Sequence, residues 1–343
     1  MVARFDFVGF GTRCASEPGR LVLDVGMTMA PGVLDHHFAE AESECAASLV
    51  VKHPELVLDH LRPGGRPADA LGPVTIVTHT LPDFDALAAV FLALRLLETG
   101  VVDEGMRTLA EYAKLADSAL LPATIDLGAT PYAVLRALFV GVRKAPEEIN
   151  AGRISEGLKF MRHLHARASE GGDITEDRTL FAGIDRYEQA VRKVDQDNAW
   201  YQGDVHHARK ITLHLPNISG AGRTAVDGLI VVNPHSFLFK EWARRDRGGS
   251  PLGRGFSFVF QNFLGLRYSL AVDPAAGVNL RDLAEVINSL ESRAAEAAGT
   301  DDRLRWYGGE CPFFNHRLVV SPHEGTRLSH DEIAAAVLRF GEA

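Results

Sequence analysis

The sequence predicts an α/β fold in which a parallel-sheet domain is followed by a smaller α+β domain. Three observations predict it: 343 residues exceed the usual size of one domain, the first part alternates apolar runs with helical patterns, and the last part carries several short β-type runs. We place the first domain at 1–125, a mostly helical connector at 126–208 and the second domain at 209–343.

Two apolar runs in the first domain have the composition of buried strands. They are RLVLDVG at 20–26 and VTIVTH at 74–79, and both end in polar residues. A helical pattern follows each run, loosely over 45–56 and clearly over 87–97, where Gly100 is expected to end the helix. Strands that alternate with helices form parallel sheets, which bind ligands at the carboxyl ends of their strands. Asp24 and His79 are expected at such ends.

The later elements follow from composition and periodicity. The alanine-rich segment 106–170 is predicted to be helical, and GGDITED at 171–177 interrupts it. Short β-type runs then follow, at 210–215, 228–233, 256–260 and 266–272. Asn279 is expected to open a helix, and Ser329 with Glu332 forms a capping box for the last one.

The composition excludes several classes of protein. A formal net charge of -9 and a pI of about 5.9 leave no overall basic field that would attract nucleic acid without local contacts. Cys14, Cys45 and Cys311 lie far apart, which argues against a disulfide framework and a structural zinc site. The segment MVARFDFVGF lacks a long apolar h-region, and no run of about 18 uncharged apolar residues occurs, so we expect a cytoplasmic protein without an export signal that does not cross a membrane.

The segment from His79 to Asp85, HTLPDFD, sets one imidazole and two carboxylates between a strand end and a helix start. Divalent cations prefer oxygen ligands, and an added imidazole favours manganese or a similar transition metal over magnesium. Pro82 stiffens the loop, so Asp83 and Asp85 are expected to serve neighbouring metals. Asp83 also has a purely structural interpretation as the N-cap of the next helix.

A second cluster, Asp35-His36-His37, follows the turn residues at 31–32, and Asp24 precedes it. Together with Asp24, the two clusters supply four carboxylates and three imidazoles, enough for two metal ions. Asp35 also has a purely structural interpretation, as a cap of the segment that follows. Either cluster alone is a weak signal, because caps and surface loops use the same residues. Their co-occurrence within the first 85 residues favours a metal site.

Three segments, HTLPDFDA at 79–86, LVLDVG at 21–26 and LDHH at 34–37, resemble the motifs of the DHH phosphoesterase superfamily. That superfamily includes single-strand-specific exonucleases, nano-RNases, cyclic-dinucleotide phosphodiesterases, exopolyphosphatases and manganese-dependent pyrophosphatases. The resemblance implies two Mn²⁺ ions, with Mg²⁺ or Co²⁺ as alternatives. It implies that His37 lies close to the substrate phosphate, that Asp35 supports the site, and that the metal ligands are His79, Asp83, Asp85, Asp24 and His36.

The motif order is permuted relative to the family, since the lone Asp and the DHH segment precede HTLPDFDA. A parallel sheet tolerates permutation when its strands keep their places in space. The family's fourth metal motif is a further Asp on a helix or loop. Our first candidate is Asp117, which could equally be a solvated helix residue, and the candidates behind it are Asp59, Asp126 and Asp185.

The last part of the chain resembles the family's substrate-binding domain, in which an R-x-S strand and a late Gly-Gly turn contact the substrate. The counterparts are Arg267, Ser269, Gly308 and Gly309, followed by Glu310 where the family carries His. An ordinary strand Arg and an ordinary glycine turn are the alternatives.

Two further features are open to a functional interpretation. The stretch Lys240–Arg254, with Phe256 nearby, could form a phosphate groove with an aromatic platform, although most short charge runs are solvated. The segment DVHH at 204–207 is predicted to be surface, and His235 is predicted to be a hydrogen-bonded loop histidine.

The expected activity is two-metal hydrolysis of phosphodiester bonds in nucleotides or short single-stranded oligonucleotides. One alternative is hydrolysis of phosphoanhydrides such as pyrophosphate, which predicts a cleft lined by Lys and Arg without stacking aromatics. Another is a nucleotide sensor that keeps the fold without catalysis, and the simplest is a structural protein with incidental motifs. A homodimer is compatible with the sequence, which nothing marks as a coiled coil.

Overall fold

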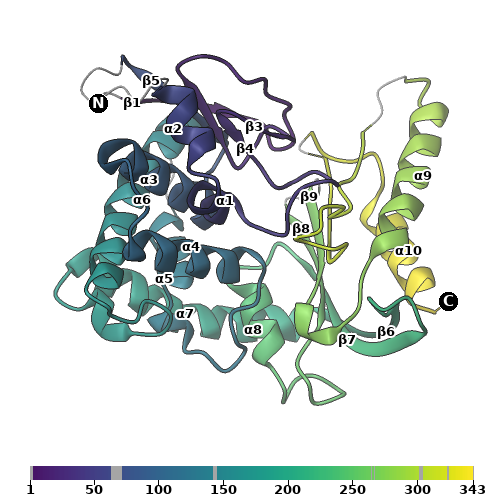
Figure 1. Cartoon of the computed structure of the whole chain (residues 1–343). Coiled ribbons are helices and arrows are strands. Elements are labelled where there is room, and N and C mark those ends of the chain that lie inside the picture. Colours follow the sequence, from purple (N-terminus) through teal and green to yellow (C-terminus); the bar gives the residue numbers. More distant parts are fainter. Residues whose placement is uncertain are drawn as a thin grey trace. The chain divides into compact units, whose positions relative to one another are not determined.

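The computed structural model is α/β, as predicted, and consists of two units that each contain one sheet (Figure 1). It describes residues 3–62, 72–141, 145–263, 265, 267–300, 304–322 and 324–342. Unit 1 comprises residues 1–121, 125–194 and 311–313, and unit 2 comprises 122–124, 195–310 and 314–343. The sheet of unit 1 is mostly parallel, and the sheet of unit 2 is mixed and mostly antiparallel.

The sheet of unit 1 has the order β1-β5-β2-β4-β3. Its strands are β1 (Ala3–Val8), β2 (Arg20–Leu23), β3 (Met29–Ala30), β4 (Val33–Leu34) and β5 (Val74–His79). β2 runs parallel to both of its neighbours, β5 and β4. The carboxyl ends of these three strands therefore meet at one edge of the sheet, where His79 ends β5, Asp24 follows β2 and the Asp35-His36-His37 segment follows β4.

The helices of unit 1 are mostly those that the periodicity predicts. They are α1 (Ala46–Lys52), α2 (Glu55–Leu61), α3 (Phe84–Thr99), α4 (Glu104–Asp117), α5 (Pro131–Phe139), α6 (Pro146–Ser169) and the first part of α7 (Asp185–His207). α3 is apolar almost all round and is buried, and it ends at Gly100, whose φ of 77° is the left-handed conformation that glycine favours. Within the described part of the predicted helical segment 106–170 lie three α-helices, α4, α5 and α6, and a 3₁₀ helix at Leu127–Ala129, and α6 ends just before GGDITED.

The sheet of unit 2 has the order β10-β9-β8-β7-β6, in which only β7 and β8 are parallel. Its strands are β6 (Arg209–Pro216), β7 (Arg223–Val232), β8 (Phe258–Phe263), β9 (Arg267–Val272) and β10 (Leu318–Val320). The helices are α8 (Phe239–Arg245), α9 (Arg281–Ala297), α10 (His330–Glu342) and the second part of α7. The predicted capping box at α10 is confirmed, since Glu332 accepts from the Ser329 N–H and Ser329 Oγ from the Glu332 N–H.

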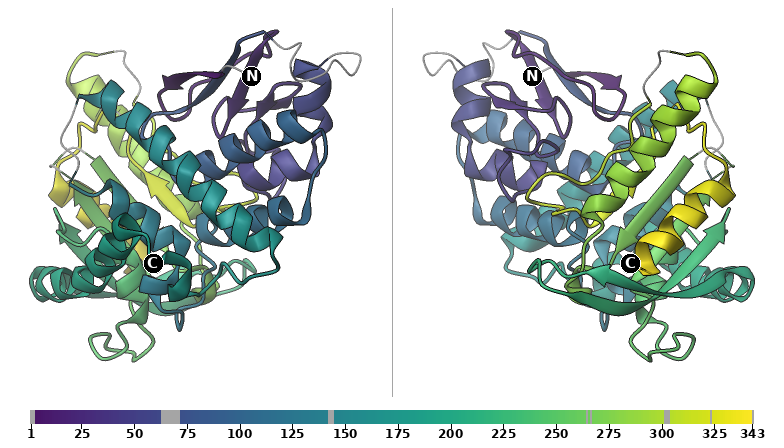
Figure 2. Two further views of the ribbon diagram at one scale, coloured as in Figure 1. Left: turned by 90° about the vertical axis from the view of Figure 1, so that its left-hand side faces the viewer. Right: turned by 90° about the vertical axis from the view of Figure 1, so that its right-hand side faces the viewer.

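Two apolar clusters cover the two faces of this second sheet. Alternate residues of a strand point to opposite faces, so Val226 and Ile230 of β7 pack in the cluster of α9 and α10, whereas Leu229 and Val231 pack with α7 and α8. Figure 2 shows α9 and α10 beside one another along this sheet.

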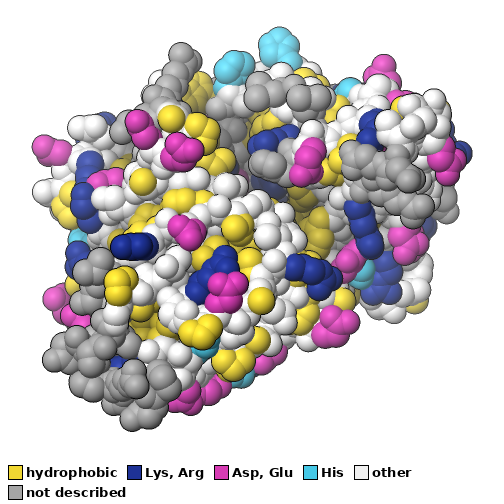
Figure 3. All heavy atoms as spheres, turned by 90° about the horizontal axis from the view of Figure 1, so that it is seen from above, with side chains coloured by type: hydrophobic (Ala, Val, Ile, Leu, Met, Phe, Trp, Pro, Cys, Tyr) yellow, Lys and Arg dark blue, Asp and Glu magenta, His cyan; other side chains and the backbone are white. Residues whose placement is uncertain are grey.

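Charged side chains of both signs are interspersed over the face seen in Figure 3. This distribution agrees with the absence of a dominant basic field from the composition. Among the residues that the structure describes, every helix is too short or too polar to span a bilayer.

Candidate metal centre

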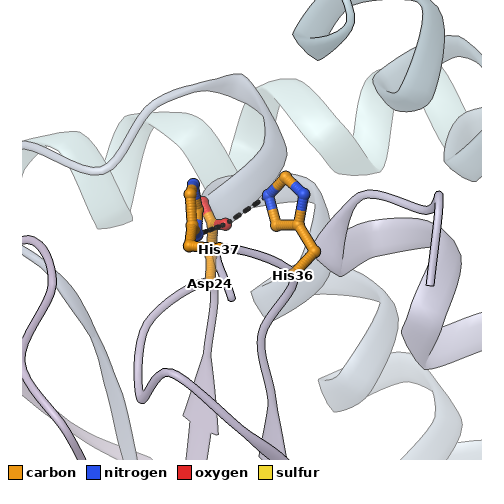
Figure 4. Close-up of side chains that lie close together, drawn as sticks. All are labelled: Asp24, His36 and His37. Atoms are coloured by element: carbon orange, nitrogen blue, oxygen red, sulfur yellow. Dashed lines mark ion pairs between the residues drawn. The ribbon is translucent and has the colours of Figure 1, made fainter. Parts of the chain in front are cut away.

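Asp24 lies at the middle of a buried group of imidazoles and carboxylates in unit 1. Its Oδ1 is 3.3 Å from His36 Nε2 and 3.7 Å from His37 Nδ1, and its Oδ2 is 3.2 Å from His79 Nε2. Figure 4 shows the two neighbouring imidazoles on either side of the Asp24 carboxylate. Asp24 has a left-handed backbone with φ of 60°, which turns the chain directly after β2; this conformation is uncommon outside glycine, and Asp and Asn adopt it more often than most other residues. The turn places the carboxylate over the strand ends.

Asp35 holds the DHH segment in place. Its carboxylate is fully buried and accepts the backbone N–H groups of Met27, His36 and His37. The same carboxylate lies 2.7 Å from His37 Nδ1. When Asp35 accepts the Nδ1 proton, the ring of His37 is fixed and Nε2 is left for another partner. The oxygens of Asp35 are therefore occupied by these hydrogen bonds, and the carboxylate positions the His37 ring.

The loop after β5 orients His79 and is held from a distant helix. His79 donates from Nδ1 to the Thr80 carbonyl oxygen at 2.9 Å, so Nε2 faces Asp24. Leu81 has φ of 57°, its N–H donates to Asn150 Oδ1 at 2.7 Å, and its carbonyl oxygen accepts from Arg153 at 2.9 Å. Both partners lie on α6, and the sequence analysis identified neither of them.

The two aspartates of this loop have different surroundings. Asp83 caps α3 by accepting the Ala86 N–H, as its alternative interpretation predicts, and its exposed carboxylate still lies 3.9 Å from His79. Asp85 is buried, and its two oxygens accept the N–H groups of Ala46 and Ala47 at 2.7 and 2.9 Å. Asp85 therefore also caps α1 from the side, and it lies 3.9 Å from His36.

Among the four candidates for a later aspartate, Asp117 is the one that lies at this site. Its Oδ2 is 3.6 Å from His36 Nε2, at the carboxyl end of α4. Asp126 instead forms an ion pair with Arg178, while Asp59 lies within α2 and Asp185 begins α7. No metal-holding group among the described residues includes these three.

Burial and mutual contact shift the pKa values of the group in opposite directions. Burial disfavours the charged form of Asp24, but its contacts with the His36 and His79 imidazoles outweigh burial and hold its pKa below the usual range. Burial lowers the pKa of His79, but the hydrogen bond with Asp24 outweighs burial and raises this pKa to about 9. Burial and the charge of Asp24 raise the pKa of Asp85 to about 8, and burial and Asp85 raise that of Asp117 well above its usual value.

The donor set fits divalent metal ions. Three groups have ligand atoms within 4.8 Å of one another: Asp24, His36 and His37; Asp24, His79 and Asp83; and His36, Asp85 and Asp117. Asp24 and His36 are each shared by two groups, so the groups are contiguous. Asp24 Oδ1 and Asp117 Oδ2 are buried and have no hydrogen-bond partner among the described residues. Buried carboxylate oxygens without a donor cost free energy, and a cation would relieve that cost.

An aromatic residue that the sequence analysis missed lies against this group. The Phe10 ring packs edge-on against His37, with centroids 4.6 Å apart, and lies 6.0 Å from His79. The residue is 48% exposed. The signal in the sequence is the glycine on either side of it, in the loop that follows β1. The loop was overlooked because β1 itself was not predicted.

The predicted substrate-binding residues all lie in unit 2. Arg267 and Ser269 are on β9, and Ser269 Oγ accepts from Lys240 Nζ at 3.2 Å, which adds a lysine to that strand's polar face. Gly308 and Gly309 pack within their own unit. A Cβ on Gly308 would lie 2.9 Å from the Ala284 Cβ, and a Cβ on Gly309 would lie 2.9 Å from the Leu318 carbonyl oxygen. The close approach explains this Gly-Gly pair without a ligand.

The DVHH segment differs in part from its prediction as a surface cluster. His206 and His207 are exposed at the end of α7, but Asp204 is buried. Its carboxylate accepts the Ser236 N–H and lies 2.9 Å from His235 Nδ1. His235 is thus hydrogen-bonded, as predicted, and its partner comes from a segment 31 residues earlier.

No protein-family model, no curated protein and no solved structure matches this chain significantly.

Proposed function

We propose that this protein is a divalent-metal-dependent phosphoesterase of the DHH type that hydrolyses phosphodiester bonds in nucleotides or short single-stranded oligonucleotides. The observation that carries the proposal is the convergence of Asp24, His79 and the DHH segment at three adjacent strand ends, with Asp85 and Asp117 beside them. The motifs that meet there are those in which the sequence resembles the DHH superfamily.

Two of the three groups of ligands could each hold one cation. His79, Asp83 and Asp24 would hold one, and His36, Asp85 and Asp117 the other, with Asp24 also near His36. Manganese suits this mixture of imidazole and carboxylate, with Mg²⁺ or Co²⁺ as alternatives. Metal ions in such a site lower the pKa of a bound water and neutralise charge on the phosphoryl oxygens.

His37 is the group proposed to contact the scissile phosphate. Burial lowers its pKa, but the bond to Asp35 and the charge of Asp24 raise it to a greater extent, so the net direction is upward. A protonated His37 donates from Nε2, because Asp35 occupies Nδ1. That edge can hydrogen-bond a non-bridging oxygen or protonate the leaving group.

Phe10 favours a nucleotide over a phosphoanhydride as the substrate. About half of the residue is exposed, and its ring touches His37. An aromatic face beside the reacting phosphate can stack on a base, which contributes about 1–3 kcal/mol, whereas pyrophosphate has nothing to stack. Phe10→Ala should therefore raise KM for a dinucleotide about ten-fold or more, while Phe10→Trp should retain activity.

The direct test is hydrolysis of a labelled dinucleotide, bis(p-nitrophenyl) phosphate and pyrophosphate with Mn²⁺, alongside EDTA. Asp117→Asn should abolish turnover, and Asp126→Asn, which changes an aspartate outside the centre, should not. Turnover of pyrophosphate alone, unaffected by Phe10→Ala, would replace the phosphodiesterase proposal with the phosphoanhydride alternative. Metal binding without turnover of any substrate would favour the nucleotide sensor.

A further inference from the structure

A second candidate site lies in unit 2 and involves none of the residues discussed for hydrolysis. It is a cavity of about 710 Å³ bounded by α7, the start of β6, the carboxyl end of β7 and the start of α10. Small-molecule sites commonly have volumes of about 300–1,000 Å³. The size alone therefore permits a small organic ligand.

The cavity arises because β7 is longer than its partner at this end. Arg209, the first residue of β6, pairs with Ile230, whereas β7 continues to Val232. The chain before Arg209 is the end of α7, so no β6 residue covers the last part of β7. Apolar side chains of β7 and the indole of Trp200 on α7 line the space, and Trp200 packs edge-on against Phe237 at 6.5 Å.

Two imidazoles on the cavity lining have their Nδ1 atoms engaged by buried groups. His235 Nδ1 lies 2.9 Å from Asp204, whose side chain is only 6% exposed, while the His235 side chain is 84% exposed. His330 Nδ1 lies 3.3 Å from the amide nitrogen of Asn262, which is also buried. A ring fixed through Nδ1 presents Nε2, so each histidine offers one oriented polar edge to a ligand.

Several side chains of the lining can donate hydrogen bonds to an anion. Arg209 and His207 line the same cavity as the two oriented histidines. Of the two acidic residues on the lining, Asp204 is occupied by His235 and the Ser236 N–H, which leaves Asp331 at the start of α10. A guanidinium with imidazole edges suits a phosphate or carboxylate, and an indole beside apolar strand residues suits a flat ring.

We propose that this cavity binds a small organic anion that carries a flat ring, of the nucleoside monophosphate class, through Arg209, His235 and Trp200. The inference is independent of the metal centre, because all of its residues belong to unit 2.

Calorimetric titration of the full-length, EDTA-treated protein with AMP tests it. AMP should bind, and adenosine and inorganic phosphate should each bind at least about ten-fold more weakly, because each lacks one half of the recognised chemistry. Arg209→Ala and His235→Ala should each weaken AMP binding about ten-fold. His206→Ala is the matched control, since His206 is exposed on the same turn and does not line the cavity, and it should leave the affinity unchanged.

Asp24→Asn separates this site from the metal centre and should leave AMP binding intact. Loss of binding in Asp24→Asn together with retention in Arg209→Ala and His235→Ala would place AMP elsewhere and overturn the proposal. Absence of AMP binding at millimolar concentration would overturn it as well. Binding of adenosine as tightly as AMP would show that the cavity does not require an anion, and binding of phosphate as tightly as AMP would show that it does not require a ring. Either result would overturn the proposal. Histidine side-chain NMR spectra of the wild type and of His235→Gln, recorded with and without AMP, show whether the variant is folded, so that a loss of affinity is not mistaken for a loss of folding.

Discussion

Asp24→Asn should destabilise the metal-free protein by an amount that depends strongly on pH. Asparagine tolerates the left-handed backbone at this position, so the substitution mainly removes a charge. The pKa of His79 is raised from its usual 6.5 to about 9, largely because Asp24 contacts it against the opposing effect of burial. Each unit of pKa corresponds to about 1.4 kcal/mol, so the raised pKa corresponds to about 3 kcal/mol of unfolding free energy.

The sign follows from the direction of the shift. A histidine with a raised folded-state pKa contributes its full stability below the unfolded pKa near 6.5, and the contribution is lost as the pH rises through about 9. Asp24→Asn should therefore cost about 2–3 kcal/mol at pH 6. At pH 9.5 the cost should be much smaller, because His79 is mostly neutral and the ionised Asp85, whose pKa is about 8, no longer faces the charge of Asp24.

The assay must report on unit 1. The three tryptophans, Trp200, Trp242 and Trp306, all lie in unit 2, so their fluorescence serves as an internal control. Hydrogen exchange of peptides from α1 and α3 in increasing urea, with EDTA, measures the stability around the centre. Asp83→Asn is the matched variant, since its carboxylate is 58% exposed and asparagine also caps helices well. An equal cost of Asp24→Asn at pH 6 and pH 9.5 would refute the electrostatic account.

Three other perturbations have expected outcomes. Mn²⁺ should bind more tightly at pH 8 than at pH 6 and release protons, because Asp85 and His79 have raised pKa values and must lose protons to coordinate. Calorimetry in buffers of different ionisation enthalpy measures the number of protons released. An affinity for Mn²⁺ that does not change with pH would contradict this prediction. Asn150→Ala should weaken Mn²⁺ binding about ten-fold by freeing the Leu81 N–H, with Asn150→Asp tested for rescue. Ser329→Ala should lower the stability of unit 2 by about 1 kcal/mol in tryptophan-monitored urea unfolding, and no change would mean that the capping box contributes little.

The features that the sequence predicted correctly are those set by local chemistry. The strand at 74–79, the helix that Gly100 ends and the capping box at Ser329 each depend on residues within a few positions of one another. β3 and β4 were missed because two-residue strands carry no periodicity and form only through pairing with β2 and with each other.

The contacts that complete the candidate site are long-range, and no local pattern encodes them. Asn150 holds the loop after β5 from 69 residues away, and Asp85 caps α1 from 38 and 39 residues away. An Asn inside a helix and an Asp in a first turn are common residues in common places, so their partners appear only when the helices are packed. Asp117 could be named as a candidate, but only the packing of α4 distinguishes it from Asp126.

The pairing of the strands shows why the proposed site does not depend on the order of its segments along the chain. β2 lies between β5 and β4 and is parallel to both, so the polar residues after these three strands meet whether β5 comes first or last in the chain. What the site requires is adjacency of carboxyl ends, and adjacency depends on strand pairing rather than on chain order.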